Sequence, residues 1–568
     1  RVLAEIVQRY GDDGSADVTT RQNIQLRGIR IEDVPEIFRK LHGVNLTSIQ
    51  SGMDNVRNIT ASPVAGIDAD ELIDTRELCQ QVQDMITNNG EGNPEFTNLP
   101  RKFNIAIAGC RDNSVHAEIN DIAFVPAFKE EILGFNVLVG GFFSARRCDA
   151  AIPLHAWVHP SDVVALCRAI LEVYRDNGLR ANRQKSRLMW LIDEWGIEKF
   201  RSEVEKQLGY PLQREAKKDE IEWEKRDHIG IFPQKQSGLN YAGLNVPVGR
   251  LFAQDMFELA RMADVYGSSE IRLTVEQNAI IPNIPDARIN AFLKESLLEK
   301  FSLNPEPLKR ALVSCTGAQF CNFAMIETKN RAVAMIEELD AAVTLTKPVR
   351  IHWTGCPNSC GQPQVADIGL MGTKARKNGK AVEGVDIFMG GKVGKDAHLG
   401  SCVMKGIPCE DLKPVLINLL IEQFGAQPKL ENPAESSVLN VDLNAATQNS
   451  NLDSLNGKSK QSSSLVEKNG ADASSRTEVF TTNSVYFVKS GKEIACDGEQ
   501  SILEAAAQAG IELPSSCQSG TCGTCKQKLL EGNVKYQGEP DALDDSDREQ
   551  GIVLTCIGQA VGRVTIDA

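Results

Sequence analysis

Eight of the fifteen cysteines in this chain are spaced like metal ligands. The first set, written CTGAQFC and CPNSC, comprises Cys315, Cys321, Cys356 and Cys360. The second set, written CQSGTCGTC with a later LTC, comprises Cys517, Cys522, Cys525 and Cys556. Four soft thiolates suit zinc or an iron–sulfur cluster. Two such sets on one chain favour a multi-electron reduction with its own electron carrier.

The neighbours of the first set favour a cluster. Small and turn-forming residues, among them Thr316 and Asn358, leave room for it and free backbone N–H groups for its sulfides. Structural zinc more often uses C-x₂-C pairs, so the spacing favours iron–sulfur over zinc and leaves both open, with metal-free buried cysteines as a third possibility. The seven remaining cysteines are expected to be small apolar fillers: Cys79, Cys110, Cys148, Cys167, Cys402, Cys409 and Cys496.

The second set has the plant-type [2Fe–2S] spacing. Gly520 and Gly523 allow a tight loop, VYFVKSGKEIACD predicts a hairpin, and SILEAAAQAG predicts a helix. The tail resembles plant-type ferredoxin, which implies a β-grasp fold. Residues 479–568 hold 13 acidic and 7 basic side chains, in keeping with the acidic docking face of ferredoxins.

The elements that must position the first set occur twice. TTRQNIQLRGI (19–29) is echoed by LTVEQNAIIPNI (273–284), and PRKFNIAIAGC (100–110) by KPVRIHWTGC (347–356). We therefore expect two similar halves related by duplication. Strand-like runs alternate with helical patterns, which predicts an α+β fold with mixed sheets covered by helices.

Two segments show the helical pattern most clearly, 162–178 and 322–339. Between 429 and 478 the sequence becomes rich in Asn, Ser, Asp and Gly, which predicts a flexible linker. We expect six parts: 1–62, a ferredoxin-like half-domain; 63–215, the first repeat; 220–300, the second half-domain; 301–428, the repeat with the cysteines; 429–478, the linker; and 479–568, the ferredoxin domain.

CTGAQFC with HWTGCPNSCGQ resembles the cluster motif of the ferredoxin-dependent nitrite and sulfite reductases. The likeness extends over 1–428 and includes SGMDNVRN, TNLPRKFN, LVGGFFS and NRQKSRLMWLIDEWG. It is greatest toward the assimilatory nitrite reductases. It implies a [4Fe–4S] cluster on the first four cysteines and a sirohaem whose iron shares Cys360 with it. Nitrite is then the substrate, ammonia the product, and reduced ferredoxin the electron donor.

The resemblance also implies which residues meet the substrate. Arg57 would orient its oxygens by charge-assisted hydrogen bonds, and Lys102 would donate protons or position water. Asn104 would favour nitrite, because similar sulfite reductases carry a second Lys there. The candidates for contact with sirohaem are Arg21, Gln25 and Arg27, which alternate along one strand-like stretch, and Arg310.

Composition excludes several classes of function. A net charge of −14 argues against a phosphate-held nucleic-acid partner. No apolar run approaches the roughly 18 residues of a membrane span.

We expect a monomer in the cytoplasm of a cyanobacterium-like cell, with the chloroplast stroma as the alternative. The chain opens at Arg1, after the strand that would hold a further substrate arginine of the family, so we expect its natural start to be missing.

Two other functions remain open at this point. One is assimilatory sulfite reduction on the same scaffold. The other is a non-catalytic electron carrier with two clusters and no haem. No glycine fingerprint for a nicotinamide or a flavin occurs in the sequence.

Overall fold

The computed structural model describes residues 1–429 except 146, 217–222, 224, 379 and 395, and residues 483–568 except 497–499, 516–519, 521–522, 537–539 and 541. The linker predicted at 429–478 lies outside the described residues apart from its first one. Two compact units, 1–427 and 428–568, divide the chain. Within the described ranges, no helix has both the length and the apolar character that crossing a membrane requires.

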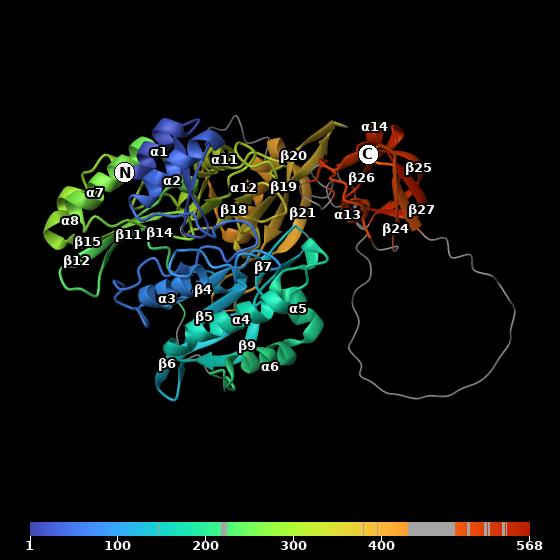
Figure 1. The fold of residues 1–568 in the computed structure, drawn as a ribbon. Coiled ribbons are helices and arrows are strands. Elements are labelled where there is room, and N and C mark those ends of the chain that lie inside the picture. Colours follow the sequence, from blue (N-terminus) through green and yellow to red (C-terminus); the bar gives the residue numbers. More distant parts are fainter. Residues whose placement is uncertain are drawn as a thin grey trace, which may run out of the picture. The chain divides into compact units, whose positions relative to one another are not determined.

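Two small antiparallel sheets in the first unit carry matching turns, and Figure 1 labels the strands of the sheet at residues 230–285. Asp17 pairs with Gln25 in one sheet, and Arg272 pairs with Ile280 in the other. Both residues of the second pair lie 255 positions after the corresponding residues of the first pair. The first sheet has the order β13-β1-β2, with β1 (Ser15–Val18), β2 (Ile24–Leu26) and β13 (Arg250–Phe252). The second has the order β11-β12-β15-β14, with β11 (Gly230–Pro233), β12 (Leu239–Leu244), β14 (Arg272–Leu273) and β15 (Ala279–Pro285).

Two larger mixed sheets follow the same duplication. Ile105 pairs in parallel with Ile122, and Ile351 pairs in parallel with Ile368. Both residues of the second pair lie 246 positions after the corresponding residues of the first pair. The six-stranded sheet has the order β10-β9-β6-β5-β4-β3, with β3 (Thr60–Ala61), β4 (Ile105–Ile107), β5 (Ile122–Lys129), β6 (Ile132–Val139), β9 (Ile152–Val158) and β10 (Gln213–Arg214). The five-stranded sheet has the order β16-β18-β19-β20-β21, with β16 (Leu312–Ser314), β18 (Ile351–Thr354), β19 (Ile368–Lys377), β20 (Lys380–Met389) and β21 (Ser401–Pro408).

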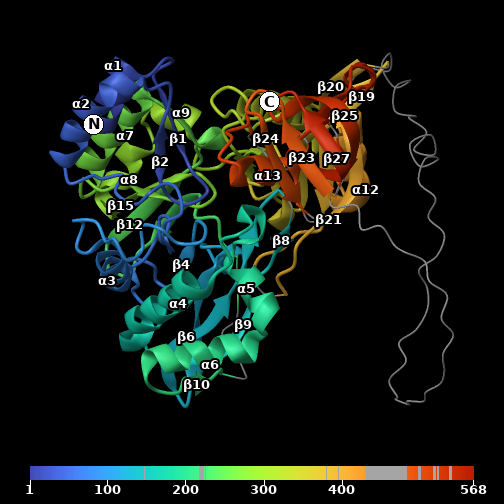
Figure 2. The ribbon, with the colours of Figure 1, turned by 45° about the vertical axis from the view of Figure 1, so that its right-hand side comes forward.

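Amphipathic helices cover these sheets and build the core. Leu166, Ile170 and Tyr174 recur at helical spacing on α4 and are buried against the six-stranded sheet. Figure 2 shows α4 and α6 lying along β6 and β9. The helices on the six-stranded sheet are α3 (Arg76–Thr87), α4 (Val163–Asn177), α5 (Leu188–Trp195) and α6 (Ile197–Leu208). Elsewhere in this unit lie α1 (Val2–Tyr10), α2 (Val34–His42), α7 (Ala253–Tyr266), α8 (Asp286–Phe292), α9 (Leu297–Lys300), α10 (Pro307–Arg310), α11 (Lys329–Ala342) and α12 (Leu412–Phe424).

One of the two predicted helices begins later than expected. The pattern at 162–178 matches α4, but the helix predicted from 322 begins only at Lys329. The segment before it is held in other ways, because Met325 donates its N–H to the Gly355 carbonyl and Thr328 donates its hydroxyl to the Cys315 carbonyl. Contacts with the cysteine loops therefore replace the first turns of this helix.

The second unit is a mixed sheet with one helix in its core, as expected for a β-grasp fold. Ser501 and Glu504 form a capping box at the start of the helix. The predicted hairpin is β23 with β24, and β23 also pairs in parallel with β27. The sheet has the order β24-β23-β27-β25-β26, and the elements are β23 (Asn483–Phe487), β24 (Lys492–Cys496), α13 (Ile502–Gln508), β25 (Lys526–Tyr536), α14 (Asp545–Glu549), β26 (Ile552–Leu554) and β27 (Gly558–Ile566).

Candidate active site

A cavity of about 620 Å³ lies in the first unit and is lined by segments of both halves. Its volume is within the ordinary range of cofactor and ligand sites. The predicted site residues that line it are Arg21, Gln25, Arg27, Arg57, Lys102, Asn104, Cys315, Thr316, Cys321, Cys356, Asn358 and Cys360. All four cysteines of the first set therefore meet the predicted substrate residues in one place.

Parallel strands bring the two cysteine pairs together. Cys315 follows β16 and Cys356 follows β18, and these strands are parallel neighbours, so the two loops leave the same edge of the sheet. The Gly355 N–H lies 3.1 Å from the Cys315 sulfur, as a backbone donor to a cluster ligand would. Gly361 must be glycine here, because a Cβ atom would lie 2.0 Å from the Trp353 carbonyl oxygen.

The arrangement of the thiols bears on which metal they suit. No three His, Cys, Asp or Glu side chains in the described part of the chain lie close enough to hold a single ion. Burial, with Cys360 and Cys315 acting in the same direction, raises the pKa of Cys356 to about 12. The four cysteines line one cavity, whose volume leaves room for a cluster.

Cationic side chains face these thiols. Burial lowers the pKa of Lys102 to about 8, with Arg187 acting in the same direction, while Cys360 opposes the fall. Within the described residues the Lys102 ammonium has no hydrogen-bond or ion-pair partner. The Nε atoms of Arg21 and Arg57 are buried, also without a partner among those residues. Buried donors of this kind suit an anionic ligand, such as a carboxylate of sirohaem.

Protein groups accept from the Nη1 and Nη2 atoms of both arginines. Arg57 donates to the Ser51 and Met53 carbonyls at 2.8 and 2.9 Å. Arg21 donates to Asn120 Oδ1 at 2.8 Å. It lies in the turn before β2 and not on the strand, so the predicted alternation with Gln25 and Arg27 was wrong for Arg21, although all three line the cavity.

Asn104 is fixed by a buried ion pair. Its N–H donates to Asp121 Oδ2 at 2.8 Å, and Arg187 binds both oxygens of Asp121 at 3.1 and 2.6 Å. The counterpart in the other half is Asp367, which accepts from the Arg350 N–H at 2.8 Å. The aspartate that each repeat carries thus has the same role, which is to hold the neighbouring strand.

Arg310 lies outside the cavity lining, contrary to the prediction. Its guanidinium binds both oxygens of Asp227, at 2.6 and 3.0 Å, and the Ile229 carbonyl. The extended strand β16 separates it from Cys315, and five residues of extended chain span about 15 Å. Closeness in sequence to a cysteine therefore did not bring this side chain to the site.

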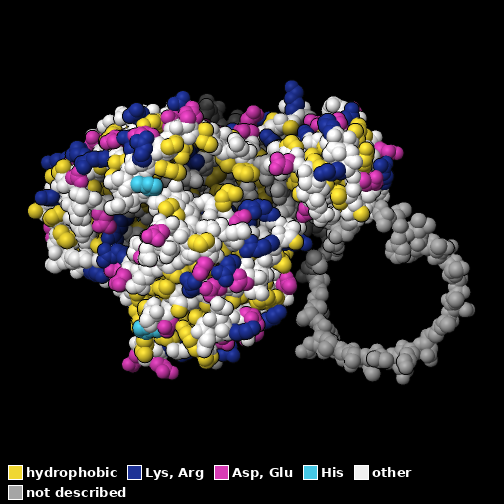
Figure 3. All heavy atoms as spheres, viewed as in Figure 1, with side chains coloured by type: hydrophobic (Ala, Val, Ile, Leu, Met, Phe, Trp, Pro, Cys, Tyr) yellow, Lys and Arg dark blue, Asp and Glu magenta, His cyan; other side chains and the backbone are white. Residues whose placement is uncertain are grey.

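Asp17 and Lys329 line the cavity without having been predicted. With Arg21, Arg27, Arg57 and Lys102, they give the lining five cations and one carboxylate. The whole chain has a net charge of −14, and Figure 3 shows acidic and basic side chains interspersed over the drawn face. A local excess of positive charge therefore distinguishes this cavity. Its apolar walls, which include Ile119, Phe143, Phe320 and Phe323, were also missed.

The first half has a filled counterpart of the cysteine site. Cys110 occupies the place of Cys356, and its sulfur lies 3.2 Å from the hydroxyl of Ser62. Cys110 packs in one buried cluster with Tyr241, whose hydroxyl lies 3.0 Å from His228 Nδ1. Buried side chains therefore fill this place, and only the second half offers the four thiols.

In the second unit the structure describes two of the four predicted ligands. Cys525 and Cys556 are buried, and their sulfur atoms are 3.1 Å apart. Cys517 and Cys522 lie outside the described residues. The two described cysteines come from the turn just before β25 and from the loop between β26 and β27, so the fold joins residues that are far apart in sequence.

Three family models match the chain. The nitrite and sulphite reductase 4Fe-4S domain matches residues 52–212 and 306–423. The nitrite/sulfite reductase ferredoxin-like half domain matches 1–44 and 232–297. The 2Fe-2S iron-sulfur cluster binding domain matches 486–560. These matches include both cysteine sets and most of the residues of the first unit.

Known proteins agree with these models. The ferredoxin–nitrite reductase of Leptolyngbya laminosa is 74% identical over 76% of this chain and 84% of its own. The chloroplastic enzyme of Spinacia oleracea is 54% identical over 77% of this chain and 74% of its own. The structure of Mycobacterium tuberculosis NirA is 32% identical, with a TM-score of 0.68 over 74% of this chain and 77% of its own. This chain therefore belongs to the nitrite and sulphite reductase family and carries a 2Fe-2S cluster binding domain after its reductase part.

Proposed function

We propose that this chain reduces nitrite to ammonia with six electrons from reduced ferredoxin. The observation that carries this proposal is the meeting of four thiols and five cationic side chains in one cavity. The thiols fit a [4Fe–4S] cluster, and Arg21, Arg57 and Lys102 fit the carboxylates of sirohaem and an anionic substrate. When bound, these groups supply electron storage and the iron that receives nitrite. The 74% identity to a ferredoxin–nitrite reductase supports the same reaction.

We assign the substrate-handling roles to three side chains of this chain. Arg57 neutralises and orients the oxygens of nitrite through charge-assisted hydrogen bonds. Lys102 supplies protons, because an ammonium with a pKa of about 8 is a stronger acid than an ordinary lysine. Asn104 is neutral, so the cavity has one positive charge fewer than it would have with a lysine at this position. The lower positive charge favours the monoanion nitrite over the dianion sulfite.

The test is the ratio of nitrite to sulfite reduction by the intact chain, measured together with its visible spectrum. We expect sirohaem bands and a strong preference for nitrite. A preference for sulfite would favour the sulfite reductase alternative. A spectrum of iron–sulfur centres without sirohaem would favour the two-cluster electron carrier. Either result would overturn the proposal.

We further infer that the fused ferredoxin domain is a tethered electron donor. The composition of residues 429–478 predicts an end-to-end reach on the order of 40 Å, which raises the effective donor concentration. The experiment compares the intact chain with an equimolar mixture of 1–435 and 479–568. We expect the mixture to be slower at low donor concentration and equal at saturation. Equal rates at low concentration would contradict a tethering role.

The remaining assignments rest on the family. Relatives from cyanobacteria and from chloroplasts are both similar to this chain. We propose the cytoplasm of a cyanobacterium-like cell, with the chloroplast stroma as the alternative, and a monomeric enzyme. Light scattering of the holoenzyme tests the monomer, and a mass of two or more chains would contradict it.

A further inference from the structure

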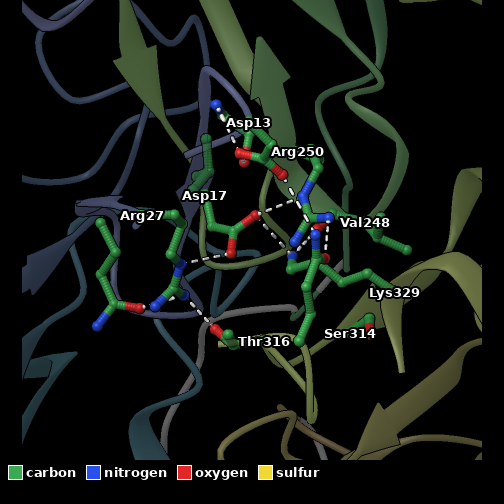
Figure 4. A network of polar contacts seen from close by, with 12 residues as sticks. Asp13, Asp17, Arg27, Val248, Arg250, Ser314, Thr316 and Lys329 are labelled. Atoms are coloured by element: carbon green, nitrogen blue, oxygen red, sulfur yellow. Dashed lines mark hydrogen bonds and ion pairs between the residues drawn. The ribbon is translucent and has the colours of Figure 1, made fainter. Parts of the chain in front are cut away.

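One buried carboxylate organises three cations beside the first cysteine loop (Figure 4). Asp17 lies on β1, directly paired with Arg250 on β13, and its side chain is 2% exposed. Its Oδ2 accepts from Arg27 Nε at 2.8 Å, and its Oδ1 accepts from Arg250 Nε at 3.1 Å. The Lys329 ammonium lies 3.5 Å from the same Oδ1. Both carboxylate oxygens are therefore used to orient cations.

The two arginines in turn hold the loop that joins Cys315 to Cys321. Arg27 donates to the hydroxyl of Thr316. Arg250 Nη1 donates to Gln319 Oε1 at 2.7 Å. Both guanidinium carbons also lie within 6 Å of the Phe320 ring centroid, at 5.9 and 5.7 Å. Arg27 and Arg250, at the small sheet β13-β1-β2, thus hold the loop at Thr316, Gln319 and Phe320.

Lys329 adds charge that the loop contacts do not require. It begins α11, its side chain is 1% exposed, and its ammonium donates to the Val248 carbonyl. Burial lowers its pKa to about 8, whereas Asp17 and Cys315 oppose the fall, so the ammonium is the main form at neutral pH. Three cations then face one carboxylate. Asp13, which accepts from Gln319 Nε2 at 3.2 Å, still leaves the group positive.

An uncompensated positive charge beside an electron carrier has a definite effect. Reduction adds a negative charge to the carrier, and a nearby cation in a low-dielectric interior stabilises that charge more than water would. The reduction potential of iron–sulfur centres is set partly by surrounding charge and hydrogen bonds. A buried cation at this position therefore favours the reduced centre.

We propose that Lys329, held by Asp17 with Arg250, is a positioning residue that raises the reduction potential of the centre bound by the Cys315–Cys321 loop. The inference rests on the proposed function, since it requires a [4Fe–4S] cluster on these thiols. It goes beyond that function by assigning a role to residues that neither bind the cluster nor meet the substrate.

The experiment uses the full-length holoenzyme and an EPR-monitored redox titration. Lys329→Gln removes the charge but retains a donor for the Val248 carbonyl, and Lys329→Arg keeps the charge. Lys300→Gln is the matched control, because Lys300 forms an ion pair with Asp255 in the same unit and does not line the cavity. Iron, acid-labile sulfide and sirohaem contents are measured for each variant. The [2Fe–2S] centre of the tail serves as an internal reference.

We expect Lys329→Gln to keep its cofactor content and to shift the four-iron midpoint potential to a more negative value. Lys329→Arg restores the potential, and neither Lys300→Gln nor the tail centre shifts. An unchanged potential in Lys329→Gln at full cluster content would overturn the inference. Loss of the cluster in Lys329→Gln but not in Lys329→Arg would also overturn the inference. The positive charge would then be needed for assembly of the cluster and not for its reduction potential. A wild-type chain without a four-iron centre would refute the proposed function instead.

Discussion

The buried ion pair between Arg187 and Asp121 should be among the most sensitive points of the reductase unit. Their side chains are 4% and 0% exposed, and the guanidinium binds both carboxylate oxygens. Replacing Arg187 by Met removes the cation and leaves Asp121 charged in an apolar interior. Removal of one partner of a buried pair costs about 3–5 kcal/mol. The guanidinium also lies 5.0 Å from the Phe142 ring centroid, so Arg187→Met loses a cation–π contact as well.

The duplication provides a matched control. Asp367 is the counterpart of Asp121 in the other half, and Arg350 binds both of its oxygens, at 3.2 and 2.7 Å. These side chains are 22% and 28% exposed, so water can solvate Asp367 when its partner is removed. We expect Arg350→Met to cost about 1–2 kcal/mol, and Arg187→Met clearly more. In both pairs the guanidinium binds both carboxylate oxygens, so burial is the main difference between the pairs, with the contact of Arg187 with Phe142 as a second one.

Urea unfolding followed by tryptophan fluorescence measures this difference. All five tryptophans lie in the first unit, so the signal reports on it alone. The free energy of unfolding falls linearly with urea, and the two variants are compared at equal slope. If unfolding is irreversible, unfolding rates are compared instead. A loss in Arg187→Met no larger than in Arg350→Met would refute the reasoning. Because Asp121 also fixes the Asn104 backbone, we expect a raised KM for nitrite.

Three further predictions concern the site. Asn104→Lys should raise the sulfite-to-nitrite ratio of kcat/KM by about tenfold, which corresponds to the free energy of one charge-assisted contact. An unchanged ratio would show that Asn104 does not determine the choice between the two substrates. Nitrite turnover should fall as pH rises through about 8, because the ammonium of Lys102 then loses its proton. The variant Lys102→Arg should move this fall to higher pH. An unchanged pH profile in Lys102→Arg would assign the titration to another group. Cys356→Ser should lower the iron content of the purified chain, whereas Cys110→Ser, at the filled counterpart, should leave it unchanged; equal losses would contradict a cluster in one half only.

Local patterns predicted the features that depend on neighbouring residues. Helical periodicity located α4 within one residue at each end, and Ser501 began the helix of the second unit. The start of α11 was missed because contacts of Met325 and Thr328 with the cysteine loops replace helical hydrogen bonds. The periodicity of the apolar residues is the same whether or not such contacts form, so it could not predict where α11 begins.

The sequence by itself determined the chemistry of the two cysteine sets and the duplication. Thiolate number and spacing are local properties, and the repeated motifs keep the same strand register in both halves. Only the tertiary structure decided which cations reach the cysteines. Arg310, five residues from Cys315, faces Asp227, whereas Asp17, from a distant segment, lies with Lys329 beside the loop. Side-chain placement there depends on how strands and helices pack, and sequence distance does not encode that packing.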